Sequence, residues 1–361
     1  MDQTISYLLG SMCFILVIIM LYIINKINLE SSNCQTIKKY SSSADPYISI
    51  FDESTGIIKP SFDVSLNTLF VKTAYNCCCT GNFKNDYVNF CALDNCNKQG
   101  VRALHFEIYS LNKKPIIATA SIDKPKYKEM YNSLDFAETM SRVFNTFMNK
   151  SDPLFLILEI NSDIYETYLG VYNALINVFG NKALIYGTSN LKDTQLKELR
   201  GKVCIIVSYK NSANYINSKL NTITCQDITN NKKLNYVQLL NSITDFNTSI
   251  TFEQDKLMYL TELYILMPNK QDYTKNYDFI SSGIRSGITF ISMNFQFNDS
   301  YLNDYNKLFL GSPMSSSGFA LKYYDNKGTL YSPIINAIQK IPDLKKPITS
   351  SNDFIKLVDV F

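Results

Sequence analysis

The sequence predicts an α/β fold, a (β/α)8 barrel that follows one N-terminal transmembrane helix. Two patterns lead to this prediction: an uncharged apolar segment near the N-terminus, and eight short apolar runs that alternate with helical stretches from Pro60 onward. The chain has 361 residues, 46% of them hydrophobic, so it can bury a barrel-sized core. The net charge is only +3 and basic residues are interspersed with acidic ones, so we expect no nucleic-acid partner.

Residues 7–24 are the predicted transmembrane anchor, within an N-terminal unit of residues 1–25. They contain no charge, and about 18 residues are the length an α-helix needs to cross the hydrocarbon core of a bilayer. A cleavable signal peptide and a buried core helix are the alternatives. The preceding MDQTIS lacks the Lys or Arg of a signal peptide, and the apolar run is long for one. We therefore expect a lipid bilayer to contact residues 7–24.

The charges beside the anchor predict a side of the membrane. Lys26, Lys38 and Lys39 follow the apolar segment, whereas only Asp2 and the terminal amine precede it. The positive-inside rule then predicts a single-pass membrane protein whose large domain is cytosolic. Residues 26–58 are predicted to be a polar tether between the anchor and that domain.

The rest of the chain is read as strands, outer helices and one interruption. The candidate strands are residues 62–67, 101–109, 114–120, 153–160, 202–209, 262–268, 287–295 and 318–322. Residues 133–149 and 165–180 carry apolar side chains at helical spacing, which predicts amphipathic helices packed on the barrel. Residues 211–251 break the alternation with Asn-rich sequence and are predicted to be a linker inside the barrel.

Several of these segments resemble, in order, the X box of phosphoinositide-specific phospholipase C. VSLNTLF (64–70) is similar to the family's S-H-N-T-Y-L, QGVRALHFEIY (99–109) to G-C-R-C-L-E-L-D, PLFLILEINSD (153–163) to P-x-I-L-S-L-E-N-H, and LKELRGKVCIIVSYK (196–210) to L-x-G-K-I-L-I-K-x-K. Residues 287–322 resemble the family's Y box, and MPNKQDYTKNY (267–277) resembles the segment before it. The resemblance implies a distorted TIM barrel of phospholipase C type, with its site at the C-terminal ends of the strands.

The same resemblance implies a division of the chain. It gives an X-box-like half barrel, a linker, a Y-box-like half barrel and a C-terminal extension, at residues 59–210, 211–251, 252–325 and 326–361.

The histidines that the family uses for proton transfer are missing from the resembling segments. One belongs to S-H-N-T, where this chain has Leu66, and the second follows the third strand, where it has Ala118 and Thr119. The chain contains one histidine in total. Loss of a general acid or base costs on the order of 10²- to 10⁴-fold in rate. We therefore predict no phosphoinositide hydrolysis and no catalytic residue.

The calcium ligands of the family are partly retained. Asn67 matches the Asn of S-H-N-T and Glu159 the Glu of L-E-N-H, whereas E-L-D appears as His105, Phe106 and Glu107. Strand alternation puts His105 and Glu107 on one face. Asn67, His105, Glu107 and Glu159 are therefore a candidate divalent metal site, for calcium or, with an imidazole ligand, zinc. The alternative is a buried His105 hydrogen-bonded to Glu107 or Glu159, with no cofactor.

Nine cysteines leave the redox state open. Cys77, Cys78, Cys79, Cys91 and Cys96 lie close in sequence, but their spacing does not fit a structural zinc site. Both reduced thiols and disulfides are consistent with the sequence, and the odd total excludes complete pairing within one chain.

The leading functional hypothesis is a membrane-anchored, catalytically inactive phospholipase C-like barrel that serves as a structural or protein-interaction component. The composition, rich in Asn, Lys, Ile and Tyr and without Trp, is typical of AT-rich genomes such as those of some large DNA viruses and some protists. In such a virus, an anchored barrel would be associated with the inner membrane of the virion. The alternatives are a metal-dependent phosphodiesterase of altered chemistry and a phosphoinositide-binding module without hydrolysis.

Overall fold

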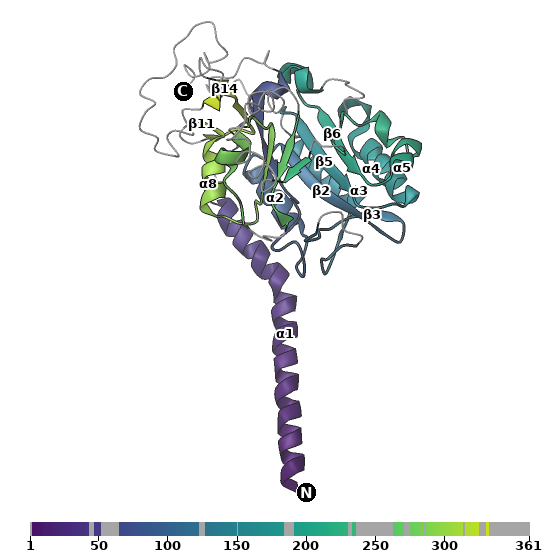
Figure 1. Cartoon of the computed structure of the whole chain (residues 1–361), viewed down its shortest axis with the longest axis vertical. Coiled ribbons are helices and arrows are strands. Elements are labelled where there is room, and N and C mark those ends of the chain that lie inside the picture. The colour runs from purple at the N-terminus through teal and green to yellow at the C-terminus, as the bar shows by residue number, and fades with distance from the viewer. Residues whose placement is uncertain are drawn as a thin grey trace, which may run out of the picture.

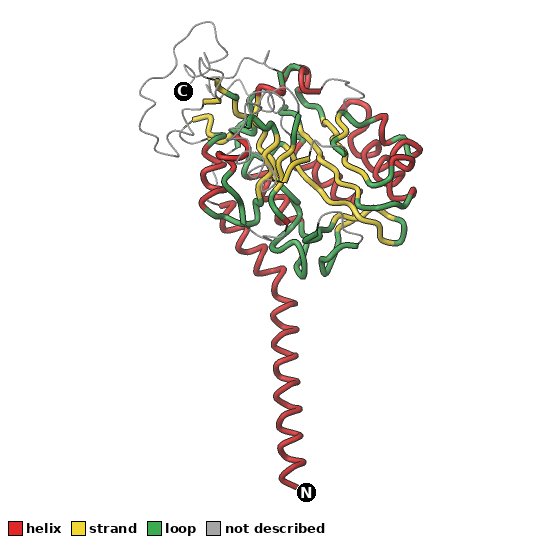
Figure 2. The backbone as a smooth tube through the Cα atoms, in the orientation of Figure 1, coloured by secondary structure: helices red, strands yellow, loops and turns green. Residues whose placement is uncertain are grey.

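The structure, a computed structural model, describes residues 2–42, 47–51, 65–122, 127–149, 151–183, 191–229, 233–235, 263–270, 275–284, 286–312, 315–324 and 330–331. It consists of a helical stalk and a barrel at one end of that stalk (Figure 1). Strands occupy the middle of the barrel, and helices lie around them (Figure 2).

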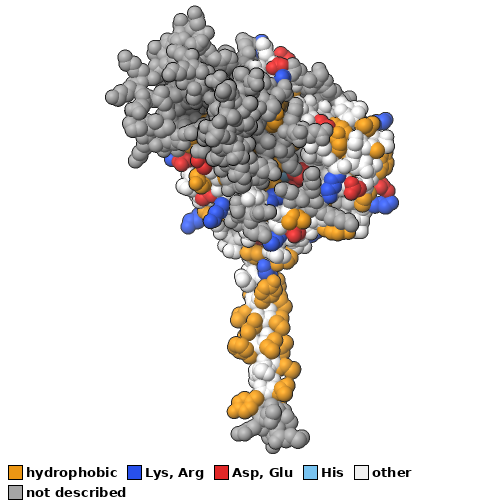
Figure 3. Space-filling view, viewed as in Figure 1, with side chains coloured by type: hydrophobic (Ala, Val, Ile, Leu, Met, Phe, Trp, Pro, Cys, Tyr) orange, Lys and Arg blue, Asp and Glu red, His pale blue; other side chains and the backbone are white. Residues whose placement is uncertain are grey.

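Helix α1, Asp2–Ser42, forms the stalk. The apolar side chains between Tyr7 and Ile24 are exposed, and they line the stalk over most of its length (Figure 3). A helix that is apolar all round is suited to a hydrocarbon environment. In the described part of the chain, α1 is the one helix long and apolar enough to cross a membrane, and an N-terminal signal sequence would have the same character.

The second half of α1 packs on the barrel, whereas residues 26–58 were predicted to be a polar tether. Glu30 accepts a hydrogen bond from Asn89 Nδ2 at 2.7 Å, and Asn33 Nδ2 donates to Asp86 Oδ1 at 2.9 Å. Ile37 is buried. These α1 residues recur at spacings of three and four, so they share one helix face. Polar pairs carry much of this contact, which is why the segment looks like a solvated linker in the sequence.

One disulfide, Cys34–Cys91, joins α1 to helix α2, Phe90–Lys98. The other cysteines are free thiols, and all of them except Cys13 are buried. The cluster of Cys77, Cys78, Cys79 and Cys96 contains no disulfide, and burial raises the pKa of each of these thiols. The pairing partner of Cys91 therefore lies outside the cluster that the sequence singled out.

Among the described residues, eight parallel strands form the barrel sheet in the order β7-β6-β5-β2-β1-β10-β9-β8. They are β1 (Leu69–Ala74), β2 (Ala103–Leu111), β5 (Leu154–Ile160), β6 (Val203–Tyr209), β7 (Gln226–Asp227), β8 (Lys233–Asn235), β9 (Ile265–Met267) and β10 (Phe290–Met293). The central strands β1 and β5 are buried along their whole length, as expected for a parallel sheet covered on both faces. The sheet curls into a barrel, which confirms the predicted fold class.

Two of the predicted barrel strands pair antiparallel instead. β3, Lys114–Ile117, folds back on β2 through the two-residue turn Asn112-Lys113, whose φ angles are 50° and 66°. Positive φ at both turn positions is typical of a tight hairpin. β13, Phe319–Leu321, pairs antiparallel with β1. The remaining strands are β4 (Leu134–Asp135), β11 (Leu310–Ser312), β12 (Ser315–Ser316), β14 (Tyr323–Tyr324) and β15 (Leu330–Tyr331).

The first barrel strand was predicted seven residues too early. Residues 65–67 of the predicted strand 62–67 are described, and they enter the 3-10 helix η2, Leu66–Thr68; residues 62–64 lie outside the described residues. The strand itself, β1, includes Lys72 and Thr73, which are both buried. Because these two side chains are polar, a search for apolar runs does not detect this interior strand.

Parts of the range predicted as a linker belong to the barrel. Helix α5, Ser212–Asn217, and strands β7 and β8 all lie within 211–251. Residues 230–232 and 236–262 lie outside the described residues, and so does the C-terminal extension apart from 330–331.

The outer helices α3, Phe136–Phe147, and α4, Tyr165–Ala183, confirm the two predicted amphipathic helices. Helix α8 is Ser300–Lys307. Asn and Asp side chains cap the N-termini of α2, α3, α5 and α8, where each accepts a backbone N–H. At the N-terminal ends of the strands, fully buried Arg102 donates to the carbonyl oxygens of Phe147, Asp152 and Pro153.

Candidate functional site

Strands β2 and β5 place three predicted site residues side by side. Glu107 of β2 is in register with Glu159 of β5, and His105 lies two residues before Glu107 on the same face. All three side chains are buried, with 0% of His105, 0% of Glu107 and 5% of Glu159 exposed. The structure therefore brings these three residues together.

Glu107 is surrounded by hydrogen-bond donors of the protein itself. Its Oε1 accepts from Asn76 Nδ2 at 2.9 Å and from the Tyr75 hydroxyl at 3.3 Å, and its Oε2 accepts from the Tyr109 hydroxyl at 2.7 Å. A buried carboxylate requires such donors because it has left water. Burial and the nearby Glu107 carboxylate both raise the pKa of Tyr109, so this hydroxyl stays protonated and acts as a donor.

Lys270 supplies the positive charge of the site. Its Nζ lies 2.8 Å from Glu107 Oε1, and the side chains of the pair are 4% and 0% exposed. Lys270 follows β9, and so comes from the second half of the barrel, whereas Glu107 belongs to the first half. An ion pair this buried holds strongly when intact, because removal of either partner leaves an uncompensated charge.

His105 is held on both edges of its ring. Nε2 lies 3.4 Å from Glu159 Oε2, and Nδ1 lies 3.2 Å from Asn76 Oδ1. The Tyr75 ring stacks on the imidazole with centroids 4.6 Å apart and an interplanar angle of 20°. We call Tyr75, Asn76, His105, Glu107, Tyr109, Glu159 and Lys270 the Glu107 cluster.

Comparison with known proteins supports the fold. No family model and no curated protein sequence matches the chain. Among solved structures it is similar to PLC21 of L. pealei, with a TM-score of 0.57 and 14% identity over 73% of this chain, and to PLC21 of S. officinalis, with 0.56 and 13% over 75%. The matches cover 38% and 40% of those chains, so this chain spans well under half their length. The fold is phospholipase C-like.

One bacterial structure aligns more weakly with this phospholipase C-like barrel. It is a calcium-dependent phosphoinositol-specific phospholipase C from a Pseudomonas species, with a TM-score of 0.45 and 12% identity over 68% of this chain and 96% of that one.

Asn67 and Leu66 do not lie in the Glu107 cluster. They belong to η2, which precedes β1, whereas the cluster gathers at the opposite end of the same strand. Asn67 Oδ1 accepts from Ser65 Oγ at 2.7 Å, and the Leu66 backbone N–H donates to Thr194 O. A six-residue strand spans about 20 Å. The structure therefore does not bring Asn67 together with the other three residues of the predicted metal site.

The amide that reaches the site is Asn76. It follows Tyr75 directly after β1, so the chain enters the Glu107 cluster as a Tyr-Asn pair. This pair was missed because the amino-acid sequence SLNT resembles S-H-N-T and so pointed to Asn67 instead. A placement that required the Asn to follow a buried strand would have found it.

Tyr109 and Lys270 were also missed. Tyr109 was visible in principle, since it lies two residues after Glu107 in the same strand and so shares its face. Lys270 had no signal in the sequence, because its ammonium meets Glu107 only through tertiary folding.

Ala118, one of the two residues at the second predicted histidine position, lies beside the site, and Thr119 follows it. The Ala118 N–H donates to the Glu107 carbonyl at 3.3 Å, and Thr119 Oγ1 donates to the carbonyl of Phe83 at 2.9 Å. Both residues are buried. Neither carries a group that titrates near neutral pH.

The remaining donors do not fit a resident divalent ion well. In the described part of the chain, no three His, Cys, Asp or Glu side chains are grouped to hold a metal. An ammonium lies against Glu107, the central carboxylate, and an ammonium has no lone pair for coordination. We therefore derive no chemical step through a metal.

Proposed function

We propose that this chain is a membrane-anchored phospholipase C-like barrel that does not cleave phosphodiesters and acts through protein contacts. The observation that carries the proposal is the Lys270–Glu107 ion pair, at 2.8 Å in the buried centre of the site. A fixed ammonium neutralises the carboxylate that a metal ion would need, and it has no lone pair with which to coordinate a metal itself. The site then stabilises the barrel without serving a substrate.

The arrangement of the other groups supports the same proposal. Proton transfer in the resembling family uses a histidine directly before an Asn, and here Tyr75 precedes Asn76. The single histidine, His105, is buried under the Tyr75 ring with both ring nitrogens next to polar partners. A general base must reach the proton it removes, and this imidazole is turned inward.

The test is an assay of the full chain in mixed micelles that contain phosphoinositides, with calcium varied from chelated to millimolar. We expect no release of inositol phosphate above a protein-free control, alongside an active phospholipase C as positive control. Release that depends on protein concentration at any calcium level would refute the proposal.

The second candidate is a metal-dependent phosphodiesterase that uses His105, Glu107 and Glu159. The proximity of these three residues favours it. It requires stoichiometric metal in the purified protein and loss of that metal in His105→Ala. We expect elemental analysis to find less than about a tenth of an equivalent of zinc or other transition metal, in wild type and variant alike.

For membrane attachment, we propose that residues 7–24 of α1 cross a bilayer and are not cleaved. The docked second half of α1 supports this, because Glu30, Asn33 and Ile37 tie the helix to the barrel directly after the apolar segment. Alkaline carbonate extraction should leave the intact chain in the membrane fraction, and a shortened soluble form would contradict it.

For the side of the membrane, the charges and the disulfide disagree. Lys26, Lys38 and Lys39 favour a cytosolic barrel, whereas Cys34–Cys91 favours an oxidising compartment. We give the disulfide more weight, since few charges follow the anchor, and propose that the barrel faces the oxidising side. Asn149 and Asn298 begin exposed N-x-S sequons, so glycosylation that Asn149→Gln and Asn298→Gln abolish would support this side. A chain that never acquires glycans and keeps Cys34 reduced in cells would place the barrel in the cytosol.

As for a role, we propose a structural or protein-interaction component of a membrane, including the inner membrane of a virion if the source is a large DNA virus. Crosslinking of the full chain in its native membrane tests this, and a chain that forms no protein crosslinks would count against it.

A further inference from the structure

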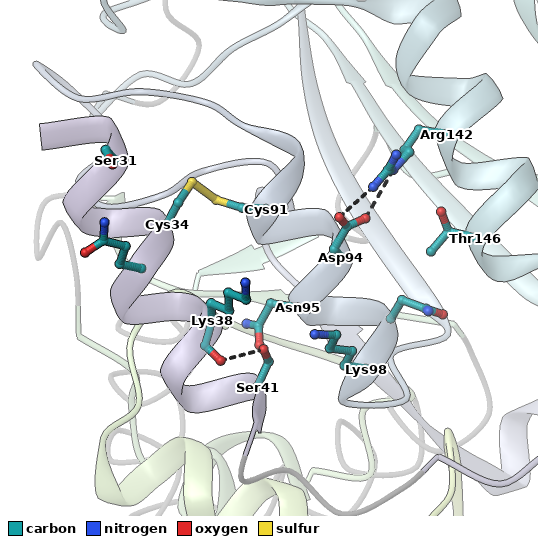
Figure 4. Close-up of a pocket in the computed structure, with 12 residues that line it drawn as sticks. Ser31, Cys34, Lys38, Ser41, Cys91, Asp94, Asn95, Lys98, Arg142 and Thr146 are labelled. Atoms are coloured by element: carbon teal, nitrogen blue, oxygen red, sulfur yellow. Dashed lines mark hydrogen bonds and ion pairs between the residues drawn. A yellow bond between two sulfur atoms is a disulfide. The ribbon is translucent and has the colours of Figure 1, made fainter. Parts of the chain in front are cut away.

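A pocket of about 560 Å³ lies outside the barrel, where α1, α2 and α3 meet (Figure 4). We call it the junction pocket. Residues of the docked half of α1 line one side of it, and residues of α2 and α3 line the other. The Cys34–Cys91 disulfide is part of its wall. It shares no lining residue with the Glu107 cluster, so it is a separate feature of the molecule.

The junction pocket is basic. Lys38, Lys98 and Arg142 line it together with one acid, Asp94, so its formal charge is three minus one, or +2. Arg142 and Asp94 neutralise each other through two contacts, Nε to Oδ1 at 3.2 Å and Nη2 to Oδ2 at 2.7 Å. Among the described residues, neither the Lys38 nor the Lys98 ammonium forms an ion pair or a side-chain hydrogen bond. Two cations from two different helices therefore remain for a ligand.

The other lining groups favour a small polar anion. Ser31, Gln35, Asn97 and Thr146 add hydroxyl and amide groups, and no aromatic ring is among the described lining residues. A flat base or ring would lack a stacking partner here. Since a water molecule takes about 30 Å³, the volume of about 560 Å³ equals roughly nineteen waters, which suffices for a phosphate with a small organic group.

We propose that the junction pocket binds a soluble phosphate-bearing small molecule, with Lys38 and Lys98 as the phosphate ligands. The soluble form follows from distance. Lys38 is fourteen residues beyond Ile24, the last residue of the apolar segment, and at 1.5 Å per residue that is about 21 Å. The headgroup layer is about 5 to 8 Å thick on each side, so a lipid phosphate does not reach the two ammonium groups. This part of the inference rests on the proposed membrane anchor.

The test uses the full chain in lipid nanodiscs and inorganic phosphate as the probe, followed by ³¹P line broadening at constant ionic strength. We expect saturable binding that sulfate competes for and chloride does not. Lys38→Gln and Lys98→Gln should each weaken it at least about fivefold, because each removes one charge-assisted contact. Lys39→Gln is the matched control: it removes the same charge from the next residue of α1, which does not line the pocket, and binding should stay unchanged.

Two results would overturn the proposal. If binding does not saturate, or if Lys39→Gln weakens it as much as Lys38→Gln, the protein only attracts anions by its overall charge. If nanodiscs with anionic lipid displace the phosphate whereas neutral nanodiscs do not, the ligand is a lipid headgroup. Both readouts are independent of phosphodiester cleavage, so they stand whether or not the barrel is an enzyme.

Discussion

Removal of the Cys34–Cys91 disulfide should destabilise the whole barrel, not only the attachment of α1. The bond closes a loop with a sequence separation of 57 residues that contains η2, β1 and the Tyr75-Asn76 pair. The chain-entropy relation for a loop of that length gives about 4 kcal/mol at 25 °C. The double variant Cys34→Ser/Cys91→Ser should lose about that much free energy of unfolding.

The assay is urea unfolding of the full chain in micelles, followed by tyrosine fluorescence because the chain has no Trp. With a urea m-value of about 3 kcal/mol/M, the midpoint should fall by about 1.3 M. Cys13→Ser is the control, because this thiol is free and lies on the exposed apolar part of α1.

A midpoint within 0.3 M of wild type, roughly 1 kcal/mol at that m-value, would refute the reasoning. It would mean that α1 detaches before the barrel unfolds, so that the crosslink does not restrict the state from which the barrel folds. Faster hydrogen exchange at residues 26–42 alone, with an unchanged midpoint, would identify that outcome.

Three further changes test the core of the molecule. Lys270→Met should lower the free energy of unfolding by about 3 to 5 kcal/mol, because it leaves the buried Glu107 carboxylate without its positive partner. Adding Glu107→Gln should recover most of this loss in chemical unfolding. Recovery would be absent if Lys270 acts only through packing. Burial lowers the pKa of Lys322 to about 7 from an ordinary 10.5. Between these two pH values the unfolded chain binds one more proton than the folded chain, so the free energy of unfolding rises with pH by up to about 1.4 kcal/mol per pH unit. Lys322→Met should remove this slope, and equal slopes in the two proteins would disprove the reasoning. Gly318→Ala should cost about 1 to 3 kcal/mol because the new Cβ collides with the fully buried Arg102 side chain, whereas Gly10→Ala, with nothing within 4 Å, should leave the melting temperature unchanged.

The fold was readable because its signals are long and periodic. β2, β5 and β6 are runs of seven to nine mostly apolar residues, and α3 and α4 repeat apolar side chains at helical spacing. β1 failed this test because Lys72 and Thr73 are buried in an interior strand, where tertiary contacts override the local pattern. The contact between α1 and the barrel was not predicted for a related reason: Glu30 and Asn33 form hydrogen bonds with polar partners that the local sequence does not reveal.

The site was half readable. Strand periodicity places His105 and Glu107 on one face, and the resemblance to L-E-N-H picks out Glu159. The register of β2 and β5 then brings the three together. Asn76 can be predicted only if the C-terminal end of β1 is placed correctly. Because β1 was misplaced, Asn67 was chosen as the site residue instead. Lys270 is separated from Glu107 by 163 positions in the chain, obtained from 270 minus 107, and no local pattern links the two.

The Glu107 cluster raises the question of why charged side chains are buried inside the barrel. Apolar side chains would fill the same space at equal or lower free energy, because burying a charge requires desolvation. What an ion pair adds is specificity: Lys270 reaches Glu107 only when the segment after β9 closes on β2, across the junction of the two halves. A misplaced second half would leave a bare carboxylate in the interior. The Lys270–Glu107 pair thus favours closure of the barrel, and the interaction role proposed above would require that fixed shape.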